Sequence, residues 1–125
     1  MEVSFQRSMA DYLREVASWR RRRYRDDLRD QRNLQSAAAL EQLADYVQQL
    51  PADNETLTQL AALTIEGGEF LPGQQAAYEI GRFRFYNQEA TFDGFLAQLV
   101  ELARADRGEH GRFGGPQVPG DNPWG

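Results

Sequence analysis

"SFQRSMADYLREVASWRRRRYRDDLRDQR" (residues 4–32) contains neither glycine nor proline, and it opens on Ser4, a good helix N-cap residue. Its apolar residues recur at helical spacing: Phe5, Met9, Tyr12, Leu13, Val16 and Ala17. We therefore predict one long helix over residues 4–32, whose apolar stripe faces a core or a partner.

A break is expected around Asn33 to Ser36, because both residues are good N-caps; the alternative is that the first helix runs straight on. A second helix is predicted over about residues 36–50, and Pro51 ends it. Its apolar residues have the spacing of an antiparallel helix pair: Leu40, Leu43, Val47 and Leu50. The first two helices are thus expected to form a hairpin.

Three further helices are expected after Pro51. Asp53 or Asn54 caps the first of them, and Gly67-Gly68 end it. Its inward-facing residues are predicted to be Leu57, Leu60, Ala61 and Leu63. The last helix is expected over residues 90–108, with Phe92, Phe95, Leu96, Leu99 and Leu102 on its apolar side.

The fourth helix, residues 72–88, is the ambiguous one. Pro72 suits a first helical turn, but residues 82–85 alternate arginine and phenylalanine, which is typical of a strand, and Gly81 weakens the helix. We favour a helix because one isolated strand would have no partner.

The chain thus reads as an all-α protein of four or five helices, with a long N-terminal helix in a helical hairpin or bundle. Its 125 residues fit one domain, residues 1–107. Residues 108–125 hold six glycines and three prolines, so we expect them to form a flexible C-terminal tail. Trp124 in the tail, in "GDNPWG", could anchor a docking peptide; folding back onto the domain and disorder are the alternatives.

Several chemistries lack their residues. There is no cysteine, and the single histidine, His110, lies in the tail, so neither a nucleophilic triad nor a common zinc site is available. We expect no enzyme activity, no metal and no other cofactor. No apolar run approaches the roughly 20 residues of a membrane span, so a cytoplasmic protein without a membrane partner is expected.

The arginine-rich stretch is the candidate functional region. Seven arginines and three aspartates give residues 18–32 a net charge of +4 in a chain of net charge −5, so the remaining residues carry −9. On a helical wheel Arg20, Arg23, Asp27 and Asp30 continue the apolar stripe. These four are either paired inside the fold or exposed on a projecting helix that is ready for a partner.

Two functions compete for this stretch, beside the plain alternative of a solvated helix face. The favoured one is a non-catalytic accessory or adaptor subunit that binds a larger protein or self-associates into a homo-oligomer. Its partner-binding candidates are Trp19, Arg20, Arg23, Tyr24, Asp27, Asp30 and Trp124. The alternative is a subunit that binds RNA or DNA, through Arg21, Arg22, Arg25, Arg29, Arg82 and Arg84.

Overall fold

The computed structural model of the chain describes residues 4–66, 68–84 and 91–107. Within these ranges the elements are α1 (Phe5–Asp26), α2 (Gln31–Gln49), α3 (Glu55–Thr64), β1 (Ile65–Glu66), β2 (Glu69–Phe70), α4 (Gln74–Gly81) and α5 (Phe92–Arg107). The predicted all-α class is confirmed, with five helices and one very short two-stranded ribbon in the described part of the chain. The predicted tail, with Trp124, lies outside the described residues.

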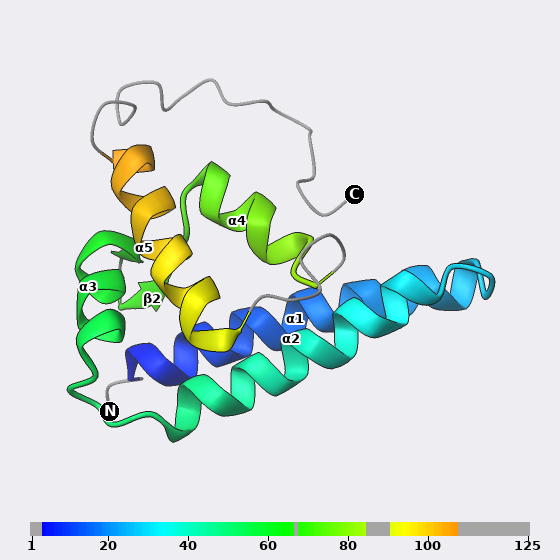
Figure 1. Cartoon of the computed structure of the whole chain (residues 1–125), viewed down its shortest axis with the longest axis horizontal. Coiled ribbons are helices and arrows are strands. Elements are labelled where there is room, and N and C mark those ends of the chain that lie inside the picture. Colours follow the sequence, from blue (N-terminus) through cyan, green and yellow to red (C-terminus); the bar gives the residue numbers. More distant parts are fainter. Residues whose placement is uncertain (1–3, 67, 85–90, 108–125) are drawn as a thin grey trace.

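The helices α1 and α2 form a long antiparallel hairpin, and the other elements gather over the end that holds the N-terminus (Figure 1). α5 packs against α3 and α4, while β2 packs against α1. The far end of the hairpin, where α1 passes into α2, extends beyond all the other helices (Figure 1). The molecule therefore has a packed body and a projecting arm.

Apolar stripes on the helices build the core as the sequence predicts. The fully buried side chains of α1 and α2 include Met9, Leu13, Val16, Leu40, Leu43 and Val47. The core extends through Leu60 of α3 to the other helices and to the segment after α4, where Phe83 lies against Phe95 with ring centroids 4.3 Å apart. Burial of these side chains removes apolar surface from water, which is the main favourable contribution to folding.

Helix caps fix the ends of these elements. Ser4 Oγ accepts the N–H of Arg7 at 3.1 Å, which confirms the predicted start of α1. Asn54, rather than Asp53, caps α3, because its Oδ1 accepts the N–H of Leu57 at 3.0 Å.

The cap of α4 comes from the last turn of α5. Asp106 accepts the N–H groups of Gln75 and Ala76 at 3.3 Å each. Gly73, the N-cap residue, leaves room for this carboxylate, since a Cβ at position 73 would lie on the Asp106 side chain. A residue thirty positions away thus holds the start of α4.

The predicted turn at Asn33–Ser36 is wrong, and so is the predicted helix end at residue 32. α1 ends at Asp26, and the turn spans residues 27–30. Aspartate side chains compete with the helix there: Asp27 Oδ1 accepts the N–H of Arg29, and Asp30 Oδ1 accepts the N–H of Arg32, both at 3.1 Å. Asn33 and Ser36 lie inside α2 and are buried.

Two other boundaries differ from the prediction. α4 ends at Gly81, and residues 82–84 form a turn that closes with Arg84 at φ 63°, so they are neither helix nor strand; residues 85–90 lie outside the described residues. After α3 the chain makes an antiparallel ribbon, with Ile65 opposite Phe70, in place of the simple helix end that Gly67-Gly68 predicted.

Candidate functional site

Arg20 ties the hairpin to the body. Its side chain is only 8% exposed. Nε and Nη2 donate to the carbonyl oxygen of Gly81 at 3.0 and 2.6 Å, and Nη1 donates to Oδ1 of Asn33 at 2.8 Å. The guanidinium therefore satisfies a carbonyl at the C-terminal end of α4, which the helix itself leaves without a donor.

Ser36 makes the matching contact from α2. Its Oγ donates to the carbonyl oxygen of Phe83 at 2.5 Å, and both residues are buried. Arg20 and Ser36 together hold the segment 81–83 against the hairpin. The hairpin is thus anchored by hydrogen bonds to backbone carbonyls that are far away in sequence.

Beyond Arg20 the residues of the hairpin are no longer buried. None of the residues 21–32 is buried. We call residues 22–32 the hairpin tip; five arginines and three aspartates give it a net charge of +2. Leu28 lies in its turn and is 62% exposed, the largest exposed fraction among the exposed large hydrophobic side chains of the described residues. The hairpin tip therefore presents one exposed apolar side chain, Leu28, among charged residues.

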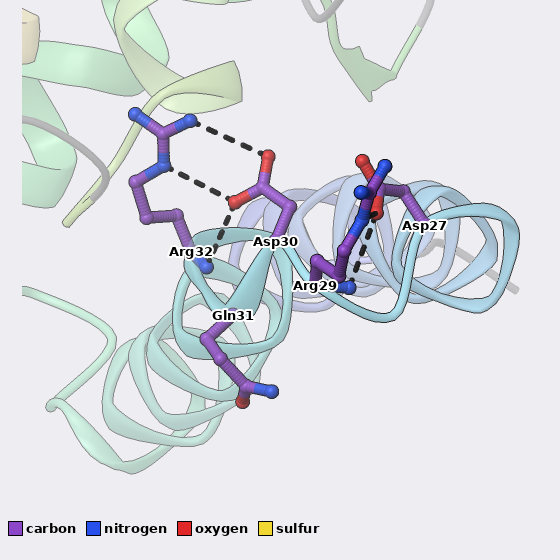
Figure 2. Close-up of a pocket in the computed structure, with 5 residues that line it drawn as sticks. All are labelled: Asp27, Arg29, Asp30, Gln31 and Arg32. Atoms are coloured by element: carbon purple, nitrogen blue, oxygen red, sulfur yellow. Dashed lines mark hydrogen bonds and ion pairs between the residues drawn. The ribbon is translucent and has the colours of Figure 1, made fainter.

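The turn of the hairpin tip is ordered by paired charges (Figure 2). Asp27 accepts from Arg29 Nε at 3.5 Å, and Asp30 accepts from Arg32 Nε at 3.1 Å. The hydrogen bond from Arg32 holds the pKa of the Asp30 carboxyl below its ordinary value. Arg29 still has 94% of its side chain exposed. Each pair shapes the turn and leaves guanidinium surface for a partner.

The predicted partner-binding residues separate into two groups. Arg23, Tyr24 and Asp27 lie at the hairpin tip, at least partly exposed. Arg20 is buried and holds the fold together, and Asp30 caps α2. We therefore leave Arg20 out of any surface that a partner contacts.

Trp19 lies at the border between these groups. Its indole is half-buried, with the guanidinium carbons of Arg20 and Arg23 at 5.0 and 5.3 Å from its ring centroid. Such distances are typical of cation–π contacts, so Trp19 links the anchored arginine with an exposed one.

The predicted nucleic-acid residues do not share one face. Arg22, Arg25 and Arg29 lie at the hairpin tip. Arg21 instead makes a two-bond ion pair with Glu41, at 2.9 and 2.6 Å, which lowers the pKa of the Glu41 carboxyl.

The other two residues of this set belong to the turn after α4. The guanidinium of Arg82 lies over the ring of Tyr78 on α4, 5.2 Å from its centroid. Arg84 lines a depression over the middle of α2, together with Gln35, Ala38, Ala39 and Gln42.

Sequence reasoning missed Leu28. It is the only aliphatic residue between Ala17 and Leu34, within a run of charged residues. A lone leucine between aspartates in a gap of the apolar stripe was the available signal.

Comparison with protein-family models, with curated proteins and with solved structures finds no match. Among the residues that the structure describes, no helix is long and apolar enough to cross a membrane, and no three side chains of His, Cys, Asp or Glu form a metal-binding group.

Proposed function

We propose that this protein is a non-catalytic, cytoplasmic adaptor subunit that docks onto another protein through the hairpin tip. The observation that carries the proposal is the exposed Leu28 at the end of a projecting and anchored hairpin. Protein interfaces typically have an apolar core with anchor side chains in pockets and a polar rim, and arginine is enriched in them relative to the rest of the surface. Leu28 supplies the anchor, and Arg25 and Arg29 supply the rim.

The arrangement suits an acidic protein surface better than a nucleic acid. Asp27 and Asp30 lie among the arginines, and the carboxylate of Asp30 occupies the N-terminal end of α2, where a phosphate would otherwise bind. A net charge of +2 at the hairpin tip is small for a surface that must neutralise several phosphates. The fixed carboxylates would repel a polyanion, while an apolar pocket with a carboxylate rim matches Leu28 and its arginines.

Anchoring by Arg20 and Ser36 supports the proposal energetically. A hairpin that is held in place before binding loses little conformational entropy when it binds. More of the free energy of its few contacts therefore contributes to affinity. The arginines steer association with an acidic partner and set its orientation.

The test is affinity capture of the full chain from its host's lysate at low salt after nuclease treatment. The variants Leu28→Asp and Arg25→Glu are compared with Arg7→Glu, which makes the same charge change on an exposed residue at the other end of α1. We expect a stoichiometric protein with the wild type and Arg7→Glu, and its loss with both hairpin-tip variants.

A direct binding measurement with labelled single-stranded and duplex DNA and RNA completes this experiment. Retention of the same proteins by both hairpin-tip variants would overturn the proposal. So would nucleic-acid binding that depends on Arg25 and weakens on the order of 100-fold between 50 and 200 mM salt, because such a slope indicates release of counterions from several phosphates.

A further inference from the structure

Exposed apolar side chains occur at both ends of the molecule. The exposed large hydrophobic residues in the described ranges are Leu28, Ile65, Leu71 and Tyr78. Leu28 lies at the hairpin tip, whereas Leu71 directly follows β2, at the opposite end of the long axis (Figure 1). Leu71 is 51% exposed, although its N–H is held by the carbonyl oxygen of Thr64 at 2.8 Å. A fixed backbone thus presents an apolar side chain to solvent.

The register of the ribbon places an acid beside this leucine. Phe70 points into the protein, where its ring lies 5.7 Å from Phe5 and 5.2 Å from Tyr12. Alternation along a strand turns Glu69 and Leu71 to the other side, and both are exposed. We call Glu69 and Leu71 the outer face of the ribbon; it combines one apolar side chain with a negative charge.

The two ends also differ in the sign of their charge. Residues 33–81 contain seven acidic residues and no arginine or lysine, but Glu41 and Asp45 are paired with arginines of α1, and Arg107 of α5 donates to the carbonyl oxygen of Leu63 beside the ribbon. On the outer face itself the negative charge is that of Glu69. The hairpin tip carries +2. The hairpin tip and the outer face of the ribbon therefore complement each other in two ways: Leu28 can meet Leu71, and an arginine of the tip can meet the carboxylate of Glu69.

One molecule cannot bring these two surfaces together. The N–H of Phe70 donates to Ser8 Oγ, so the ribbon lies beside the first turn of α1, and the 18 steps along the helix from Ser8 to Asp26 span about 27 Å. From this separation we infer that the chain assembles head to tail, with the hairpin tip of one copy on the outer face of the ribbon of the next. The inference deepens the proposed function, on which it rests, by naming a second copy of this chain as a partner of the tip.

A single contact between two different surfaces leaves one surface of each copy free, unless two antiparallel copies make the contact twice and close the pair. As concentration rises, the assembly should therefore either close as a dimer with both contacts made or grow into a larger ring or an open chain. It should weaken at high salt, which screens exposed charges.

Sedimentation velocity of the full chain, from micromolar to millimolar concentration at low and high salt, tests this. The variants are Leu28→Asp for the hairpin tip and Leu71→Asp for the ribbon, with Tyr78→Asp as a control for an exposed apolar residue on neither surface. Glu69→Arg is a second ribbon variant that leaves Leu71 in place, and circular dichroism establishes that each variant is folded.

We expect concentration-dependent oligomers for the wild type and Tyr78→Asp, and monomers for each of the other three variants. An equimolar mixture of Leu28→Asp and Leu71→Asp should form dimers and nothing larger, because one intact copy of each surface remains in the mixture.

Two results would overturn the inference: a wild type that stays monomeric at millimolar concentration and low salt, or a variant mixture that stays monomeric. A monomeric wild type that still captures a protein in an Arg25-dependent manner would overturn head-to-tail assembly alone, and the proposed docking function would stand.

Discussion

Arg20 and Arg25 lie five residues apart on α1, in the same run of arginines, and their surroundings differ completely. The side chain of Arg20 is buried, and all its described hydrogen bonds go to the carbonyl of Gly81 and the amide of Asn33. Arg25 is exposed and makes no ion pair with a described residue. One arginine is part of the core of the fold, and the other is available to a partner.

The difference shows that an arginine-rich run is not one functional unit. The environment of each guanidinium depends on what the rest of the chain places opposite it. The body supplies Arg20 with a helix-end carbonyl that needs a donor, whereas Arg25 belongs to the hairpin tip, which extends beyond the other helices that the structure describes (Figure 1).

The largest expected effect separates these two arginines directly. Arg20→Met should lower the free energy of unfolding by about 3 kcal/mol, because it leaves the Gly81 carbonyl and the Asn33 amide oxygen without their donor in a buried place. Arg25→Met, the matched variant, should change it by less than about 0.5 kcal/mol. Urea unfolding measures the free energy of unfolding of both variants. Equal losses would contradict the distinction between the buried Arg20 and the exposed Arg25.

A smaller loss is expected for Ser36→Ala, the second anchor. Removal of the hydroxyl leaves the buried carbonyl of Phe83 unsatisfied, which should cost about 1–2 kcal/mol. Ser18→Ala is the control, since the exposed Ser18 hydroxyl has Arg22 as its only hydrogen-bond partner among the described residues. A Ser36→Ala protein as stable as the control would show that the hairpin does not depend on this bond.

The turn of the hairpin tip can be weakened without touching the body. Asp30→Ala removes the N-cap of α2 and should cost about 1 kcal/mol, with faster amide exchange in residues 29–33 and little change in the core. Asp26→Ala serves as the comparison, since that carboxylate caps no helix N-terminus. Equally faster amide exchange along the whole of α1 and α2 would contradict a local role of Asp30 at the hairpin tip.

The smallest effect concerns the ion pair of Arg21 and Glu41, which joins α1 to α2. Both side chains are about two-fifths exposed, so Glu41→Gln should cost about 0.5 kcal/mol at neutral pH. The pKa of Glu41 is lowered in the fold, so its contribution is present above the ordinary glutamate pKa of about 4.3 and is lost as pH falls through the folded value. The stability difference between variant and wild type should shrink as the pH falls below the ordinary glutamate pKa and vanish once Glu41 is protonated in the fold, as thermal unfolding at several pH values would show.

The long helices could be predicted because their apolar stripes are local patterns. The end of α1 could not, since Asp27 and Asp30 fit a solvated helix as readily as a turn, and only their bonds to Arg29 and Arg32 distinguish the two. The predicted turn at Asn33–Ser36 was wrong for a related reason. Both are residues that often begin helices, but here they are buried polar groups.

The candidate site was predictable in place but not in detail. The charge pattern located residues 18–32, and the wheel marked Arg20 as unusual. Its partner, Gly81, lies 61 residues further along the chain, so no local pattern could show that Arg20 is buried. The ribbon was hidden by its length of two residues per strand, although a pair of glycines between two short segments, here Ile65-Glu66 and Glu69-Phe70, is a known hairpin signal.

The cap that Asp106 provides for α4 has a consequence for synthesis on the ribosome. The sequence of the hairpin is complete after 49 residues, but the start of α4 gains its carboxylate thirty residues after Ala76 is made. At 5 to 20 residues per second, translation leaves α4 uncapped for roughly 1.5 to 6 s. A chain that stops before Asp106 would therefore contain the whole hairpin sequence but lack the side chain that caps α4.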